Sequence, residues 1–339
     1  MRLLIVKTSS LGDVIHCLPA VSDAARALPA LRVDWVVEEA YASIPEWHRA
    51  VDRVIPLALR RWRRAPFALA THRDIARTAR AIRDTRYDLV LDAQGLVKSA
   101  LAACLARGPR VGLDARSARE PLATALYGRR LAVAIDQHAI VRQRALFALA
   151  LGLGVPNGPP DFGLDRSPRP SAPRPRPYVV LLHGTTWASK HWPEAAWRGL
   201  AGLATAHGYD ALVPAGSPAE AERARRIAAG LDGVECLPPG NLASLAALLA
   251  GAAGVVAVDT GLAHLAGALG APTIALYGPT APSLTGTVGP RQRTLASTRS
   301  CAPCLLRSCP LPPEPHGHPP CLADVTPEMA WSALADLSR

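Results

Sequence analysis

Several signatures of common nucleotide- and metal-dependent enzymes are missing from this sequence. It contains neither G-x-G-x-x-G nor G-x-x-x-x-G-K-[ST], the glycine patterns that mark a dinucleotide-binding fold or a P-loop. It also has no H-E-x-x-H and no Asp-x-Asp pair, which are common ways to hold a catalytic divalent ion. These absences argue against a dehydrogenase and an NTPase, and they predict chemistry that proceeds without a metal.

Long apolar runs are also scarce. The first run, residues 3–6, ends at Lys7 and is too short for the apolar core of a secretory leader, so we expect a cytoplasmic protein. The best candidate for a membrane span, residues 242–258, is short and is interrupted by Ser244, Gly251 and Gly254. A buried helix followed by a buried strand explains that stretch better than a span does.

Lysine is rare, and the positive charge is unevenly distributed. Only three of the 38 basic residues are lysines, namely Lys7, Lys98 and Lys190. Residues 1–155 hold 24 Lys and Arg against 14 Asp and Glu, a net charge of +10, whereas residues 156–339 hold 14 against 13, a net charge of +1. A field of this sign attracts nucleic acid, anionic lipid or a phosphorylated substrate.

The length of 339 residues suits two domains better than one. Strand-like runs alternate with helical patterns throughout, which predicts βαβ units and mostly parallel sheets. The predicted strands are 2–6, 33–37, 89–92, 110–112, 131–134, 178–182, 211–214, 255–258 and 273–276, and the predicted helices lie near 14–28, 71–85, 97–106 and 138–151, with another opening at Pro193.

Proline content divides the chain. We expect a first Rossmann-like domain over 1–155, a stiff Pro-rich linker over 156–177, and a second Rossmann-like domain over 178–325. A last helix over 326–339 opens with a Thr-Pro-Glu cap signal and is expected to pack across the domain interface.

The opening of the chain reads as strand, polar loop and helix, and it puts Asp13 at the helix start. A helix N-terminus exposes unpaired N–H groups and a partial positive charge. Open α/β sheets bind ligands just beyond such loops, so this loop is the first candidate site.

Two further loops in the second half have the same strand-to-helix placement. In residues 259–264, Thr260 and Gly261 can offer backbone N–H groups to a phosphate; a plain helix cap is the alternative. In residues 183–192, hydroxyl side chains accompany Lys190, a point charge suited to a diphosphate; a solvated loop is the alternative.

Two clusters of side chains stand apart from these loops. Residues 60–64 place four arginines around Trp62, which suits phosphates, carboxylates or nucleic acid, or else forms a solvated helix face. Near the end, His316 and His318 accompany four of the seven cysteines. These cysteines are Cys301, Cys304, Cys309 and Cys321. A structural zinc site and reduced loop thiols are the two interpretations.

Together, these motifs resemble the lipopolysaccharide heptosyltransferases of glycosyltransferase family 9, and within them the heptosyltransferase I group. The resemblance covers nearly the whole chain. It is carried by the sequences at residues 4–14, 35–39, 91–99, 117–121 and 259–264.

The resemblance implies a GT-B fold, in which two Rossmann-like α/β/α domains face a central cleft. The first domain would receive the acceptor and the second the nucleotide sugar. The implied reaction is inverting, metal-independent transfer of L-glycero-D-manno-heptose from ADP-heptose to Kdo of Kdo2-lipid A, with no cofactor beyond ADP-heptose as co-substrate. It would take place in the cytoplasm, with the enzyme peripheral to the cytoplasmic face of the inner membrane.

The resemblance also implies roles for individual residues. Asp13 would be the general base, and Lys190 would stabilise the departing ADP in place of a metal ion. The implied donor-binding residues are Thr185, Thr186, Lys190, Glu220, Asp259, Thr260, Gly261, Leu262 and His264. The implied acceptor-binding residues are Lys7, Ser9, Ser10, Gly12, Arg60, Arg63, Arg64, Lys98 and Arg119.

Two alternatives stay open. The cysteine cluster is more typical of heptosyltransferase II, which would mean that a later heptose is added. An arginine-rich nucleic-acid-binding protein without transferase activity is the alternative from another class, although no RRM, KH or helix-turn-helix pattern supports it, and no nucleic-acid partner is expected.

Overall fold

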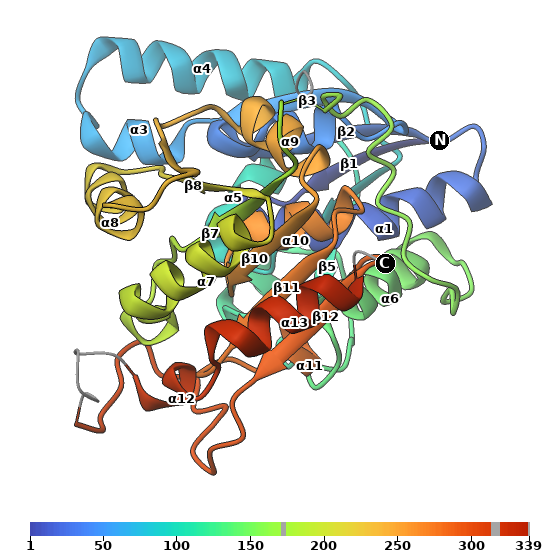
Figure 1. The fold of residues 1–339 in the computed structure, drawn as a ribbon. Helices are drawn as coiled ribbons and strands as arrows, with labels where there is room; N and C mark the ends of the chain where they lie inside the picture. The colour runs from blue at the N-terminus through green and yellow to red at the C-terminus, as the bar shows by residue number, and fades with distance from the viewer. Residues whose placement is uncertain (171–173, 313–318, 338–339) are drawn as a thin grey trace. The chain divides into compact units, whose positions relative to one another are not determined.

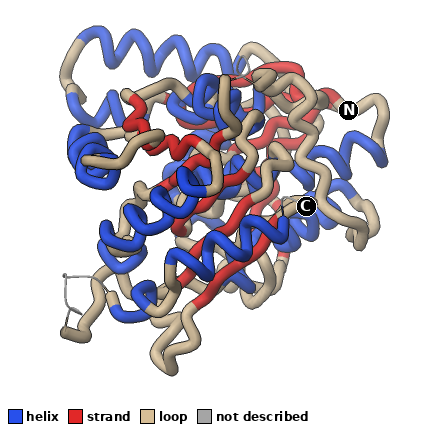
Figure 2. Tube along the Cα trace, viewed as in Figure 1, coloured by secondary structure: helices blue, strands red, loops and turns tan. Residues whose placement is uncertain are grey.

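A computed structural model describes residues 1–170, 174–312 and 319–337. The chain divides into two compact units, Met1–Ser167 and Pro168–Arg339, which are described one at a time (Figure 1). Both are built from parallel strands joined by helices, and the strands are red and the helices blue in Figure 2.

The first unit is built on a parallel sheet with the strand order β3-β2-β1-β4-β5-β6. The strands are β1 (Arg2–Val6), β2 (Arg32–Glu38), β3 (Val51–Leu57), β4 (Leu89–Asp92), β5 (Arg110–Leu113) and β6 (Arg129–Leu131). The helices are α1 (Leu11–Ala27), α2 (Ser43–Glu46), α3 (Leu59–Arg64), α4 (Leu69–Arg83), α5 (Val97–Cys104) and α6 (Ala139–Leu151), with short 3₁₀ turns η1 (Glu39–Tyr41) and η2 (Pro121–Leu126).

Alternation along β1 builds two apolar faces. Leu4 and Val6 pack with Ile82 of α4 and with α5 alanines in one buried cluster. Leu3 and Ile5, also fully buried, point to the opposite face because successive strand side chains alternate. Helices α1 and α6 pack against each other, and a buried ion pair from Arg144 Nε to Asp23 Oδ2 at 2.5 Å ties them together.

The second unit repeats this plan with the strand order β12-β11-β10-β7-β8-β9. The strands are β7 (Tyr178–Leu182), β8 (Asp210–Pro214), β9 (Val234–Leu237), β10 (Gly254–Val258), β11 (Thr273–Tyr277) and β12 (Gln292–Ala296). The helices are α7 (Glu194–Ala206), α8 (Pro218–Ala228), α9 (Leu242–Ala250), α10 (Gly261–Ala268), α11 (Pro282–Thr285), α12 (Pro320–Ala323) and α13 (Pro327–Leu337), with the turn η3 (Ala188–Lys190).

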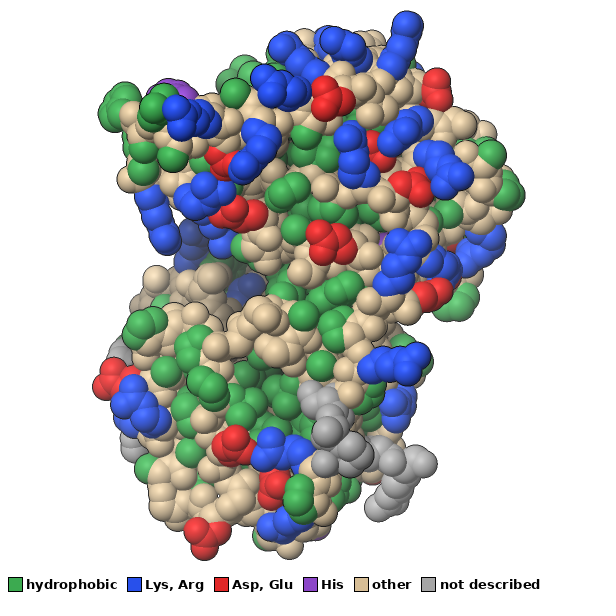
Figure 3. Space-filling model, turned by 90° about the horizontal axis from the view of Figure 1, so that it is seen from above, with side chains coloured by type: hydrophobic (Ala, Val, Ile, Leu, Met, Phe, Trp, Pro, Cys, Tyr) green, Lys and Arg blue, Asp and Glu red, His purple; other side chains and the backbone are tan. Residues whose placement is uncertain are grey.

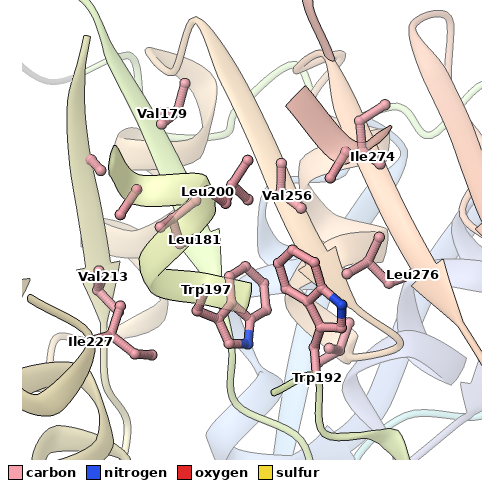
Figure 4. Close-up of a cluster of buried hydrophobic side chains, with 14 of the residues drawn as sticks. Val179, Leu181, Trp192, Trp197, Leu200, Val213, Ile227, Val256, Ile274 and Leu276 are labelled. Atoms are coloured by element: carbon pink, nitrogen blue, oxygen red, sulfur yellow. The ribbon is translucent and has the colours of Figure 1, made fainter. Parts of the chain in front are cut away.

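Two buried tryptophans organise the core of the second unit (Figure 4). The rings of Trp192 and Trp197 meet edge to face with their centroids 4.8 Å apart, a favoured aromatic geometry. Trp192 also donates its indole N–H to the carbonyl of Val325 at 2.9 Å. Helix α13 packs against α7 and strands β10–β12 of the same unit, so the last helix closes this core.

Most of the predicted elements are confirmed, and the differences fall in two places. Residues 242–258 form a helix and then a strand, as predicted, and no helix among the described residues is long and apolar enough to cross a membrane. The boundary between the units lies inside the Pro-rich segment, but residues 156–167 belong with the first unit. Arg49 shows why, because its N–H donates to the carbonyl of Gly163 and its guanidinium pairs with Asp161. That α13 packs across the domain interface stays a prediction.

Strand prediction failed at the sheet edges. Strands β3, β9 and β12 are absent from the predicted strands, and β6 spans 129–131 rather than 131–134. All four stand at the ends of their sheets.

Candidate active site

Each sheet has one point where the strand order reverses. In the first unit, β2 and β3 follow on one side of β1, and β4 to β6 lie on the other. In the second unit, β7 and β10 are the corresponding neighbours. Ligands of open α/β sheets bind beyond the carboxyl ends of the strands at such switch points, and the predicted site loops follow β1, β7 and β10.

Asp13 lies in the first turn of α1, as predicted, and also caps that helix. Its Oδ2 accepts hydrogen bonds from the N–H of Ser10 at 2.8 Å and from the Ser10 hydroxyl at 2.9 Å. This pairing of Ser10 with Asp13 is a capping box, a motif that satisfies N–H groups which the helix itself leaves unpaired. Neither bond involves Oδ1, so the half-buried carboxylate keeps an oxygen suited to accept a proton from a substrate hydroxyl.

Gln94, which sequence reasoning missed, holds the loop that precedes Asp13. Its side-chain oxygen accepts hydrogen bonds from the N–H groups of Thr8 at 3.0 Å and Ser9 at 3.1 Å. Gln94 follows β4, so these bonds bridge the switch point of the first sheet. The only sequence signal was its place two residues after a buried strand, within the stretch 91–99.

A buried carboxylate fixes the turn that carries Gln94. Asp92 accepts from the Tyr127 hydroxyl at 2.6 Å, from Ser99 Oγ at 2.8 Å and from two backbone N–H groups, those of Gln94 at 2.8 Å and Gly95 at 3.2 Å. Burial raises the pKa of the Asp92 carboxyl, and these hydrogen bonds act in the opposite direction. The turn after β4 is therefore rigidly held beneath the Asp13 loop.

The two predicted acceptor-side lysines differ in their surroundings. Lys98, half-buried on α5, donates from Nζ to Ser9 Oγ at 3.1 Å and so stands beside the Asp13 loop. Lys7 is only 5% exposed, and its Nζ donates to the carbonyl of Ala93 at 3.0 Å. The Lys7 side chain therefore turns inward and braces the loop that follows β1, and its contact with the acceptor stays a prediction.

Gly12 and Arg119 are two further residues predicted on the acceptor side. Gly12 is buried in the first turn of α1, and Arg119 is exposed in a segment tied to α5. The tie is made by Glu120, whose carboxylate accepts the N–H of Val97 at 2.8 Å.

Arg60, Arg63 and Arg64 lie on the short helix α3 and are exposed, and their contact with an acceptor stays a prediction. Arg60 donates to the Tyr41 hydroxyl at 2.7 Å and stacks over its ring.

Lys190 and Asp259 form the centre of the predicted site in the second unit. Lys190 Nζ lies 2.6 Å from Asp259 Oδ2, and both side chains are largely buried. The hydroxyl of Thr280, which sequence reasoning missed, donates to the same oxygen at 2.7 Å. This ion pair holds a lysine ammonium at the C-terminal end of β10, where it can meet a phosphate.

Several other predicted donor residues surround this ion pair. Thr185 Oγ1 donates to the carbonyl of Asp259 at 3.2 Å, and His264 Nε2 lies 3.9 Å from Asp259 Oδ1. Thr260 caps α10 in an extended conformation. The N–H groups of Gly261 and Leu262 therefore open that helix, where backbone donors attract anions. Thr186 is exposed in the loop after β7.

Glu220 approaches the same loop from α8. Its Oε2 accepts the N–H of Gly216 at 2.7 Å, and its N–H donates to Ser217 Oγ at 3.2 Å. A Cβ placed on Gly184 would lie 2.8 Å from Glu220 Oε1. The carboxylate is therefore packed directly against the loop after β7, and a side chain at Gly184 would displace it.

A distant loop secures the turn that carries Lys190. Ser189 Oγ donates to the carbonyl of Leu306 at 2.6 Å, and its N–H donates to the carbonyl of Arg307 at 3.1 Å. Trp187 has Lys190 Nζ 4.4 Å and Arg307 Cζ 5.6 Å from its ring centroid, so both cations contact this indole.

The four clustered cysteines share a small apolar cavity of about 180 Å³, and all are free thiols. Among the residues with described positions, no group of three or more His, Cys, Asp or Glu side chains is arranged to hold a metal ion. Burial raises the pKa of the Cys321 thiol to about 11. A structural zinc site and reduced thiols both stay predictions for Cys301, Cys304, Cys309 and Cys321, and His316 and His318 lie outside the described residues.

Comparisons with known proteins agree with the architecture of both units. The model of glycosyltransferase family 9 (heptosyltransferase) matches residues 75–314. Lipopolysaccharide heptosyltransferase 1 of Pseudomonas aeruginosa is 53% identical over 310 residues, which cover 91% of this chain and 87% of that protein. The Escherichia coli K12 protein of the same name is 48% identical over 301 residues, covering 88% and 94%.

A solved structure extends this similarity to three dimensions. The E. coli heptosyltransferase WaaC with ADP superposes with a TM-score of 0.85 at 43% identity, covering 99% of this chain and 100% of that one. The GT-B fold class predicted from the sequence is thus confirmed. With this match over nearly its full length, the chain belongs to glycosyltransferase family 9, the heptosyltransferases, and is a glycosyltransferase.

Proposed function

We propose that this chain transfers L-glycero-D-manno-heptose from ADP-heptose to a Kdo residue of Kdo2-lipid A in the lipopolysaccharide inner core. The observation that carries the proposal is the Lys190–Asp259 ion pair at the switch point of the second sheet, 2.6 Å long and seated beside the N-terminus of α10. The similarity to a heptosyltransferase solved with ADP supports a nucleoside diphosphate as the ligand of this site.

In the proposed reaction, Asp13 removes the proton from the acceptor hydroxyl as that oxygen attacks the anomeric carbon of heptose. The new C–O bond forms while the bond to the β-phosphate oxygen of ADP breaks, so the configuration inverts. Negative charge develops on the departing ADP. Lys190 and the N–H groups that open α10 stabilise that charge, which is the role that a metal ion has in other transferases.

The acceptor side follows from the charge of the first unit. Kdo2-lipid A carries carboxylates and phosphates, and residues 1–155 have a net charge of +10. On the face drawn in Figure 3, Lys and Arg side chains clearly outnumber Asp and Glu side chains. Lys98, Arg119 and the arginines of α3 are the proposed acceptor contacts, and peripheral association with the inner membrane is part of the same proposal.

Transfer of radiolabelled ADP-heptose tests this function. We expect label in Kdo2-lipid A in the presence of EDTA, and the opposite anomeric configuration in product and donor by NMR. Asp13→Asn should lower kcat at least about 10³-fold, because the base is lost, while calorimetry shows unchanged ADP affinity. Lys190→Ala should weaken ADP binding at least tenfold.

The acceptor that receives the label distinguishes this activity from the addition of a later heptose. Label that enters only an already heptosylated Kdo2-lipid A would reassign the chain to the addition of a later heptose. Full activity of Asp13→Asn would refute the proposed base, and full ADP affinity of Lys190→Ala would refute the proposed phosphate site.

A further inference from the structure

An apolar segment of the first unit is presented to solvent between two arginine-rich helices. Every residue from Arg63 to Ala70 is exposed, and the six that follow Arg64 are all apolar. Phe67 is 92% and Leu69 is 64% exposed. This segment, residues 63–70, joins the end of α3 to the start of α4 (Figure 1). Single exposed apolar side chains are ordinary, but a contiguous exposed run usually marks an interaction site.

Positive charge surrounds this segment. Residues 59–83 contain eight arginines and a single acid, Asp74. Asp74 lies on the buried side of α4 and pairs with Arg61 and Arg77. Arg63 and Arg64 therefore precede the apolar run, and Arg73 follows it.

The arrangement on α4 continues this pattern along one helix face. Its buried residues are Thr71, Asp74, Thr78 and Ile82. Leu69 and Arg73 are four residues apart and exposed, so they are neighbours on the outward side. The exposed apolar residues 65–70 thus lie next to exposed arginines, and residues 63–70 include no acidic side chain.

We propose that residues 63–70 together with Arg73 form a surface that docks on an anionic lipid bilayer. Phe67 and Leu69 would enter the boundary between headgroups and acyl chains, and Arg63, Arg64 and Arg73 would contact lipid phosphates. A bilayer satisfies both features at once, because an apolar layer lies directly beneath an anionic one. Nucleic acid would use the arginines but leave the aliphatic side chains without a partner.

The inference rests on the proposed function only in that a lipid-linked acceptor brings the enzyme to a membrane. Binding itself needs neither donor nor acceptor. It can therefore be measured separately from transfer, and the two proposals can fail independently.

Vesicle co-sedimentation of the full chain tests the surface. Vesicles of phosphatidylcholine with about 30% phosphatidylglycerol should bind the protein, and vesicles of phosphatidylcholine alone should bind it at least tenfold more weakly. Phe67→Ser with Leu69→Ser should lower affinity for the anionic vesicles at least tenfold, and Arg73→Gln about fivefold with a weaker salt dependence.

Matched controls separate docking from folding. Ile135 is 63% exposed in the same unit, and Ile135→Ser should bind vesicles like the wild type. The variants replace exposed residues, so circular dichroism and the melting temperature should not change. The double variant should glycosylate a detergent-dispersed acceptor at the wild-type rate, but an acceptor embedded in vesicles more slowly.

Equal vesicle binding by the wild type and the double variant would overturn the inference, as would binding that is indifferent to phosphatidylglycerol. A wild type that transfers heptose to a dispersed acceptor yet binds no vesicles would refute the docking surface and the peripheral association, and leave the transfer reaction intact. Normal vesicle binding without any heptose transfer would refute the function and leave the surface.

Discussion

Gln94 offers a sharp test of how the Asp13 loop is held. The replacement Gln94→Met keeps the length of the side chain but removes the oxygen that accepts the N–H groups of Thr8 and Ser9. Thr8 is fully buried, so its N–H finds no water, and an unsatisfied buried donor costs about 1–3 kcal/mol. Ser9 is partly exposed and loses less.

We therefore expect the variant to lose about 2 kcal/mol of unfolding free energy, equivalent to a melting temperature about 4–8 °C lower for a unit of this size. The measurement is thermal unfolding of the full chain, followed by circular dichroism. The variant Gln94→Glu is the matched control. A carboxylate oxygen can accept both N–H groups, so most of the lost stability should return.

The same variant should separate kcat from donor affinity. A loosened loop displaces Asp13, and a displacement of 1 Å costs roughly 10²-fold in rate. Calorimetric ADP affinity should stay unchanged, because the donor residues belong to the second unit. Wild-type melting temperature and kcat in Gln94→Met would refute the reasoning, and so would a Gln94→Glu variant as impaired as Gln94→Met.

Three other predictions concern the first unit. Arg144→Met removes the buried partner of the Asp23 carboxylate and leaves it only the partly exposed Arg26, which should cost about 3 kcal/mol in urea unfolding. Adding Asp23→Leu should restore part of this, and no recovery would contradict the ion-pair argument. Burial lowers the pKa of His48 to about 4, so the unfolded chain takes up its proton first and stability is lost as pH falls from about 6.5 to 4. Melting curves should show a shallower acid limb for His48→Gln, and an unchanged limb would exclude His48 as its source. Gly112→Ala places a Cβ 2.5 Å from the Tyr127 ring, which should cost about 1–3 kcal/mol and change the near-UV circular dichroism. A variant with wild-type stability would show that the ring moves freely.

The fold could be predicted to the extent that strands are buried on both faces. Strands β1, β4 and β7 read as continuous apolar runs because helices cover them on both sides, and their predicted bounds are confirmed. The edge strands β9 and β12 contain exposed or half-buried residues throughout. Their sequences therefore lack the apolar run on which the prediction depended.

The site could be predicted where a residue belongs to a strand-to-helix loop. Asp13, Lys190 and Asp259 all stand in such loops, and the structure brings the latter two into contact. Gln94 and Thr280 were missed because their partners are 86 and 21 residues away. Each of these residues meets its partner only because of the order of strands in the sheet, and this order cannot be read from the spacing of residues along the chain.

The hydrogen bond from the Ser189 hydroxyl to the carbonyl of Leu306 has a consequence for the synthesis of the protein. This carbonyl lies 117 residues further along the chain. A ribosome adding 5–20 residues per second needs about 6–23 s to cover that distance. A nascent chain can therefore already contain all strands of the second sheet before the hydrogen bonds from Ser189 to Leu306 and Arg307 can form. Until then, the turn that carries Lys190 is not held in place. Nucleotide would then recognise only a finished chain, and its binding would draw the newly released protein towards the native state.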